Sequence, residues 1–257
     1  MAEALAKPAV PGDPLQKLDA AVIAPRPARR YRAAAFQIYV LFAAAVFVAL
    51  AVIARTVAYF PIDLTITRAV QSYHGPTFDH LMYAISWIGF MPQVDVAAAL
   101  AIVLLFGAGL RWEAVVALFA AAGVGIGTLV KLVVYRPRPS ADLVHVLKQL
   151  PSAGFPSGHV LEATAFCGFL TFLGYSLLKP GALRGMVLIA FGAFILLMGL
   201  SRIYEGAHWF SDVMGAYLFG SLWLALTIKV YRWGKPRFFA HQPMAPEIPA
   251  APAAPAA

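Results

Sequence analysis

The sequence predicts an all-α integral membrane protein with six transmembrane helices. Of its 257 residues, 61% are hydrophobic and only 12% are charged, whereas soluble domains carry about 25% charged residues. The mean hydropathy is +0.75. The apolar residues are concentrated in six long runs, and roughly 17–25 such residues are enough to span a bilayer. Together these observations exclude an ordinary soluble domain.

The six runs define the predicted helices in order. The first covers residues 33–54, and the others cover 94–110, 112–135, 160–178, 183–200 and 213–230. The second is short and begins near Asp95. Residues 78–90 have apolar side chains at helical spacing, so they either extend this second helix or lie in the membrane interface.

The chain on either side of these helices is polar. Residues 1–32 end in a basic cluster, and residues 233–257 are first basic and then rich in Pro and Ala. Such compositions do not build a core. We therefore expect two disordered tails around one membrane domain at residues 33–232. The single cysteine, Cys167, excludes a disulfide framework.

The positive charge points to the membrane rather than to nucleic acid. Twenty Lys and Arg against twelve Asp and Glu give a net charge of +8. In a chain with long apolar runs, this excess indicates orientation in the bilayer and contact with anionic lipid headgroups. With both termini inside, thirteen of the twenty Lys and Arg lie on the inner side. The positive-inside rule then predicts a multi-pass plasma (inner) membrane protein with cytoplasmic termini.

Three polar stretches lie at helix ends. Residues 131–139 end the third helix, residues 155–159 open the fourth, and residues 201–212 join the fifth and sixth. Counting the crossings places all three at the membrane face opposite the termini, which is the periplasmic or cell-exterior face. Because the count depends on hydropathy alone, the convergence independently indicates an active site there.

These stretches supply groups that suit an anion. Lys131, Arg138 and Arg202 are three fixed cations; an arginine fork matches phosphate oxygens, and a lysine acts as a point charge. Ser157 and Gly158 lie where the fourth helix begins. Free N–H groups at a helix N-terminus favour an anion, and a glycine permits its close approach.

The same stretches supply groups for covalent chemistry. His208 and Asp212 are four residues apart and share a helix face. A carboxylate there holds one imidazole nitrogen and leaves the other as a nucleophile. His159, from another helix, is placed to protonate a leaving group. With the cations, this combination is typical of a phosphoryl-transfer site.

These residues resemble the type 2 phosphatidic acid phosphatase (lipid phosphate phosphatase) superfamily, in its bacterial membrane branch. The resemblance covers about residues 33–230, and the signatures are complete and in order: Lys131 with Arg138-Pro139, Pro156-Ser157-Gly158-His159, and Ser201-Arg202 with His208 and Asp212.

The resemblance implies a six-helix membrane hydrolase that removes phosphate from lipids without a metal or other cofactor. It implies that His208 attacks phosphorus and becomes a phosphohistidine, that Asp212 orients it, and that His159 protonates the leaving oxygen and then activates water. The implied phosphate-binding residues are Lys131, Arg138, Ser157, Gly158 and Arg202.

Three further residues have two interpretations each. Glu162 lies one turn after His159. Its carboxylate either interacts favourably with the helix dipole or influences His159 or the bound substrate. Arg136 and Tyr204 either flank the phosphate or anchor the chain in the interface. His208 and Asp212 with Glu162 or Glu205 make a poor metal site, because the surrounding cations repel a divalent ion.

We predict hydrolysis of a membrane lipid phosphate or diphosphate: an isoprenoid diphosphate, phosphatidylglycerophosphate, phosphatidate or a lipid A phosphate. Analogy with single-chain bacterial relatives slightly favours the isoprenoid diphosphate. Two alternatives remain, a phosphotransferase that passes phosphate between lipids, and a lipid-phosphate binding or transport protein without chemistry. The sequence leaves the preferred lipid, the oligomeric state and the role of the tails open.

Overall fold

The structure is a computed structural model that describes residues 26–90 and 92–238. The chain divides into two units, residues 1–45 and 46–257. Most of the predicted tails lies outside the described residues, so the predicted domain boundaries stay a prediction. In the first unit, the described residues belong to one helix, whose exposed Ile38, Leu41 and Phe42 suit contact with lipid.

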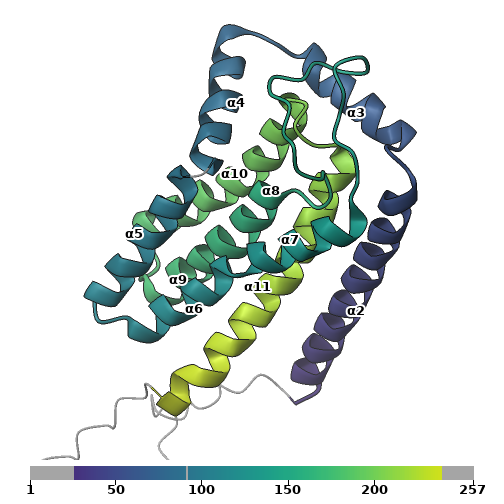
Figure 1. Ribbon diagram of the computed structural model, residues 1–257. Coiled ribbons are helices and arrows are strands. Elements are labelled where there is room, and N and C mark those ends of the chain that lie inside the picture. Colours follow the sequence, from purple (N-terminus) through teal and green to yellow (C-terminus); the bar gives the residue numbers. More distant parts are fainter. Residues whose placement is uncertain (1–25, 91, 239–257) are drawn as a thin grey trace, which may run out of the picture. The chain divides into compact units, whose positions relative to one another are not determined.

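The described residues form helices and loops only (Figure 1). In chain order the helices are α2 (Arg26–Thr56), α3 (Pro61–Ser72), α4 (Pro76–Gly89), α5 (Gln93–Gly107), α6 (Arg111–Ala121), α7 (Gly123–Val134), α8 (Gly158–Glu162), the π-helical turn η1 (Ala163–Cys167), α9 (Gly168–Leu177), α10 (Ala182–Tyr204) and α11 (Phe210–Phe238). The predicted all-α class is confirmed.

The predicted membrane helices have matching segments. Five are each long and apolar enough to cross a bilayer: Ala33–Thr56, Arg111–Val134, Gly158–Leu177, Ala182–Tyr204 and Phe210–Phe238. A sixth arises if α4 and α5, bent by 62° at their junction, count as one span. Residues 78–89 thus belong to a helix of their own, α4, which meets the second predicted helix at a sharp bend.

The helix ends differ from the hydropathy pattern where polar residues are buried. Helix α10 continues to Tyr204, beyond the predicted end at residue 200, because Ser201, Arg202 and Ile203 are enclosed by protein and keep their helical hydrogen bonds. Helix α3 (Pro61–Ser72) has no counterpart among the helices predicted from the sequence. Its apolar residues are too few for a span, and its buried side chains are polar Asp63 and Thr67.

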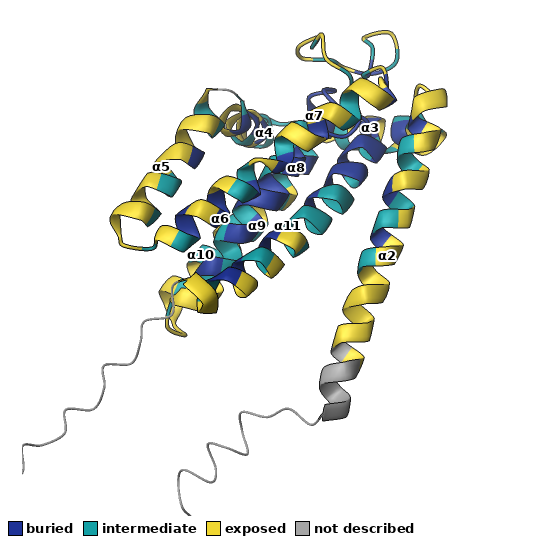
Figure 2. Ribbon diagram, turned by 60° about the horizontal axis from the view of Figure 1, so that its bottom comes forward, coloured by how far each residue is buried: buried dark blue, intermediate teal, exposed yellow. Residues whose placement is uncertain are grey.

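The core lies along the α8–η1–α9 segment and its neighbours. Val160 and Leu161 of α8 are fully buried, as is Ala216 of α11. Figure 2 shows buried residues gathered on these central helices, whereas α5 is mostly exposed. The exposed α5 side chains include Leu100 and Leu104, which is the pattern of a helix that faces lipid rather than water.

Helix α3 holds the long loop at residues 135–157 over one end of the second unit (Figure 1). The Gln71 side-chain amide donates to the carbonyl of His145 at 2.7 Å and to that of Tyr204 at 2.9 Å. Arg68 donates to the carbonyl of Leu143 at 3.1 Å. The loop therefore has fixed partners on α3 and at the end of α10, next to the beginning of α11.

Candidate active site

The three polar stretches meet at this end of the second unit. Tyr135 ends α7 in the left-handed conformation, with φ of 49°, and the prolines that follow cannot continue a helix. The chain therefore turns into the loop, and Arg136 and Arg138 point to different partners. Gly206, with φ of 64°, makes the turn from α10 to α11. A Cβ there would lie 2.1 Å from the His145 carbonyl oxygen, so this position requires glycine.

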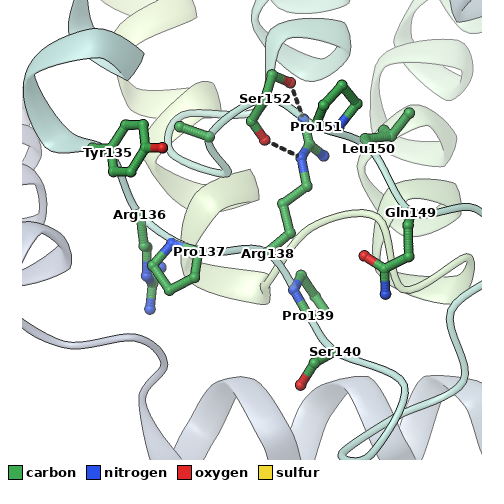
Figure 3. A pocket seen from close by; sticks show the side chains of 11 residues that line it. Tyr135, Arg136, Pro137, Arg138, Pro139, Ser140, Gln149, Leu150, Pro151 and Ser152 are labelled. Atoms are coloured by element: carbon green, nitrogen blue, oxygen red, sulfur yellow. Dashed lines mark hydrogen bonds between the residues drawn. The ribbon is translucent and has the colours of Figure 1, made fainter.

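Arg138 contacts the predicted nucleophile directly. Its Nη1 lies 3.0 Å from Nε2 of His208 and donates to the carbonyl of Ala207 at 2.6 Å. Its other nitrogens reach Ser152, with Nε donating to the carbonyl at 2.6 Å and Nη2 to the hydroxyl at 2.9 Å. Figure 3 shows this side chain extended from the loop to Ser152.

This contact defines the tautomer of His208. A guanidinium only donates hydrogen bonds, so Nε2 is an acceptor and the ring proton of the neutral imidazole lies on Nδ1. Nδ1 faces Oδ2 of Asp212 at 3.6 Å, which is longer than a hydrogen bond. Such contacts often shorten when substrate binds. The Nε2 lone pair is thus directed to the Arg138 guanidinium.

Burial and the surrounding cations keep His208 neutral. The side chain is 1% exposed. Burial, then the charges of Arg138 and Lys131, hold the pKa of His208 well below its usual value. Burial also lowers the pKa of Arg138 to about 10, so its guanidinium is still charged at neutral pH.

Lys131 and the start of α8 form another side of the site. The Lys131 ammonium donates to the carbonyls of Ala153 at 3.0 Å and Gly154 at 3.4 Å. A Cβ on Gly158 would lie 3.9 Å from the Lys131 side chain, so the two predicted phosphate ligands are neighbours. The buried Ser157 hydroxyl has no hydrogen-bond partner among the described residues.

Arg202 is buried with part of its guanidinium unused. Its Nη2 donates to the Ser86 hydroxyl and to the Glu205 carboxylate. Its Nε and Nη1 have no partner within the described part of the chain. Unsatisfied buried donors are costly, and together with Ser157 they leave hydrogen-bonding capacity for an anion.

His159 packs against the junction of α4 and α5. Its ring lies 5.0 Å from that of Phe90 in an edge-on arrangement, and the same phenyl ring lies 5.1 Å from the Arg202 guanidinium. A Cβ on Gly89 would lie 3.0 Å from the His159 ring. The end of α4 is therefore a wall of the site on the side of the predicted leaving-group acid.

The three residues with open roles lie in different surroundings. Arg136 is 1% exposed and pairs with Asp63 and Asp212. The Tyr204 hydroxyl bonds to Asp79 of α4, and its ring lines a separate cavity of about 240 Å³. Glu162 is half-buried and has no hydrogen bond or ion pair with the residues that the structure describes. Their predicted influence on the substrate stays a prediction.

A cavity of about 500 Å³ opens beside Arg138 (Figure 3). It is lined by residues 135–140 and 149–153, so the loop forms its wall. The Arg138 side chain extends along this cavity to Ser152, and the same guanidinium also contacts His208. Among the described residues, no three His, Cys, Asp or Glu side chains gather as metal ligands.

Sequence reasoning missed several residues of this site. Asp63 and Ser86 belong to no signature, and Phe90 ends the segment 78–90, for which the sequence allows either an extension of the second helix or an interfacial position. A carboxylate such as Asp63, within the first turn of a short helix between apolar segments, is a signal for a buried partner. Ser86 and Phe90 have no such signal, because a serine and a phenylalanine in an apolar helix are ordinary.

Comparison with known proteins identifies the family. Residues 111–236 match the model of the PAP2 superfamily, and this range holds every predicted signature residue. The chain carries a PAP2 superfamily domain.

Relatives of this PAP2 chain include bacterial enzymes. Phosphatidylglycerophosphatase B of Bacillus subtilis (strain 168) is 28% identical over 184 residues, which are 68% of this chain and 86% of that protein. Undecaprenyl-diphosphatase BcrC of the same organism is 37% identical over 97 residues, or 37% of this chain and 45% of the relative.

A solved structure has the same fold. The crystal structure of a transmembrane PAP2 type phosphatidylglycerolphosphate phosphatase from Bacillus subtilis superposes with a TM-score of 0.66 at 25% identity, covering 77% of this chain and 98% of that one. The predicted family, the multi-pass membrane fold and the lipid phosphatase class are confirmed. The side of the membrane on which the site lies stays a prediction.

Proposed function

We propose that this PAP2 protein hydrolyses phosphate from a membrane lipid phosphate or diphosphate through a phosphohistidine on His208. The observation that carries the proposal is the position of His208, with Nε2 3.0 Å from Arg138 Nη1 and Nδ1 facing Asp212. This geometry presents a neutral nucleophile to a group of cations.

The proposed substrate phosphate binds among the cations. Arg138 and Arg202 donate to its oxygens, Lys131 contributes a point charge, and the Ser157 hydroxyl and the N–H of Gly158 assist. The unsatisfied Nε and Nη1 of Arg202 support this assignment, because an anion would satisfy them. Fixed donors also stabilise the charge that develops on the phosphoryl oxygens in the transition state.

The first chemical step forms a bond from His208 Nε2 to phosphorus and breaks the bond from phosphorus to the lipid oxygen. His159 gives a proton to that oxygen. Asp212 stabilises the imidazolium that forms at His208. In the second step His159 takes a proton from water, the hydroxide attacks phosphorus, and inorganic phosphate leaves His208 neutral again.

The proposed lipid enters sideways, with its chain among the membrane helices and its phosphate at the face opposite the termini. In this arrangement the termini are cytoplasmic and the site faces the periplasm or cell exterior. The excess of Lys and Arg on the inner side supports this orientation.

The test is phosphate release by the detergent-purified protein with EDTA present. The panel contains undecaprenyl diphosphate, phosphatidylglycerophosphate and phosphatidate, because two of these are named by the relatives and the third by the family. We expect metal-independent release of phosphate from at least one lipid. The order of the release rates across the panel indicates the substrate class. Release that requires an added divalent cation would contradict the proposal.

Two controls separate this function from the alternatives. His208→Ala distinguishes the protein from a contaminating phosphatase, since it should remove release. A labelled lipid phosphate mixed with an unlabelled lipid alcohol distinguishes hydrolysis from transfer. Label in inorganic phosphate supports the hydrolase, and label in a new lipid phosphate would favour the phosphotransferase.

A further inference from the structure

A buried charge network lies behind the proposed nucleophile. Asp63, on the first turn of α3, and Asp212, on the first turn of α11, are both fully buried, and Arg136 lies between them. Arg136 Nη2 donates to Asp63 at 2.9 Å, and its Nη1 donates to Asp212 Oδ1 at 2.7 Å. One cation therefore serves two carboxylates.

Asp63 also holds the start of α11. Its Oδ1 accepts from the backbone N–H of Ser211 at 2.7 Å, and its Oδ2 accepts from the Ser211 hydroxyl at 2.8 Å. The same hydroxyl accepts from Arg136 Nη1 at 2.6 Å. The residue before Asp212 is thus fixed through both its backbone and its side chain.

The contacts continue from this network to His208. Arg136 occupies Oδ1 of Asp212, which leaves Oδ2 for the N–H of Trp209 at 3.1 Å and for Nδ1 of His208 at 3.6 Å. Arg136 therefore helps to orient the Asp212 carboxylate, and Arg136 is itself held by Asp63 and by the Ala58 carbonyl, which accepts from its Nε at 3.1 Å.

We propose that Asp63 is a positioning residue for the reaction, acting on His208 through Arg136 and Asp212. This inference rests on the proposed function. The sequence interpretations placed Arg136 beside the phosphate or in the membrane interface, whereas here its guanidinium faces two carboxylates.

The charge balance explains what Asp63 contributes. Two carboxylates and one guanidinium carry a net charge of −1, so Arg136 is shared and Asp212 keeps enough negative charge to support the imidazolium of His208. Without the charge of Asp63, Arg136 interacts with Asp212 alone and weakens that support. Without Arg136, two buried carboxylates lack a cation, which is the more damaging change.

The charges of this network predict that the losses of kcat are not additive across three variants: Asp63→Asn, Arg136→Gln and the double variant. We expect Asp63→Asn to lower kcat about tenfold with little change in KM. Removing a residue that orients an active-site group typically lowers activity about 10–100-fold. Arg136→Gln should lower kcat further. The double variant should recover at least several-fold over Arg136→Gln, because removing one carboxylate relieves the uncompensated charge.

Glu113→Gln is the matched control, since Glu113 is a buried carboxylate of α6 that pairs with Lys235 at the opposite end of α11. Thermal unfolding of each variant is measured beside its kcat. A wild-type kcat in folded Asp63→Asn, or additive losses in the double variant, would overturn the inference. An equal loss of kcat in Glu113→Gln, at the same loss of thermal stability, would also overturn the inference.

Two more variants keep the test decisive. If Asp63→Asn does not fold, Arg136→Lys is compared with Arg136→Gln: recovery of kcat by lysine is expected, and equal loss overturns the inference. His208→Asn separates the two proposals. Turnover that survives it overturns the proposed function and this inference together, whereas an inactive His208→Asn beside a fully active Asp63→Asn overturns the inference alone.

Discussion

Nη1 of Arg138 lies 3.0 Å from Nε2 of His208, so this arginine, a predicted phosphate ligand, occupies the lone pair of the proposed nucleophile. The guanidinium also holds the carbonyls of Ser152 and Ala207. In the proposed mechanism, a phosphoryl group takes over the donor that contacts Nε2. Substrate binding then exposes the lone pair and brings phosphorus to it in the same movement.

Replacing Arg138 with lysine tests the planar fork. An ammonium cannot contact Ser152, Ala207 and His208 together, and it lacks the bidentate geometry that suits phosphate. We expect kcat/KM to fall on the order of 100-fold, the effect of losing one preorganised donor. The measurement is steady-state phosphate release at equal folded protein. A fully active Arg138→Lys variant would rule out bidentate binding.

The acid limb of the pH profile should depend on the same arginine. A lowered pKa keeps His208 unprotonated, and therefore nucleophilic, to a pH below its usual value. Arg138→Gln removes one of the charges that lower this pKa, so the pKa rises and the acid limb of kcat/KM moves to higher pH. The substrate ionises alike in both proteins and cancels from the comparison. An unmoved limb would mean that another group controls it.

His159→Ala should distinguish two kinds of substrate. A lipid alcohol leaves poorly without a proton, whereas the phosphate ester released from a diphosphate leaves more readily. We expect a loss of about 10²–10⁴-fold on a lipid monophosphate and a clearly smaller loss on a diphosphate, measured as kcat on both. His74→Ala is the matched control, because His74 lines the separate cavity beside Tyr204. Equal losses on the two substrates would refute the leaving-group role.

The opposite end of the second unit offers a test of stability alone. The Lys235 ammonium and the Tyr231 hydroxyl both donate to Glu113 Oε1, at 2.6 Å and 2.9 Å. Lys235→Met leaves the buried carboxylate with one partner and should destabilise the protein by about 1–2 kcal/mol. The effect is modest because the Lys235 side chain is 38% exposed and solvent screens the pair.

Lys229→Met is the matched control, since Lys229 is exposed on the same helix. Thermal unfolding in detergent should show a lower midpoint for Lys235→Met only, with kcat per folded molecule unchanged in both. Equal midpoints for the two variants would show that the ion pair contributes nothing measurable.

Hydropathy and local motifs predicted most of the fold and the signature residues of the site. The predicted shared helix face of His208 and Asp212 is wrong, because α11 begins at Phe210 and His208 lies in the turn before it. The four-residue spacing nevertheless predicted that the two side chains lie close together, and six apolar runs located the membrane helices. These features depend on residues close together in the chain, so they are visible without the tertiary structure.

The missed parts depend on contacts between distant residues. Asp63 meets Arg136 across 73 positions and Ser211 across 148, and Ser86 meets Arg202 across 116. No periodicity encodes such pairs. The bend between α4 and α5 also escapes a hydropathy count, because both helices are apolar; at the end of α4, Gly89 packs closely against His159 and Met198.

The most direct test of the phosphohistidine is to trap it. Purified protein is mixed with lipid substrate carrying labelled phosphate, and the reaction is quenched with alkali, in which phosphohistidine survives. The account predicts alkali-stable, acid-labile label on wild-type protein, located at His208, and neither label nor turnover in His208→Asn. Turnover near the wild-type rate in that variant, or label at another residue, would contradict it.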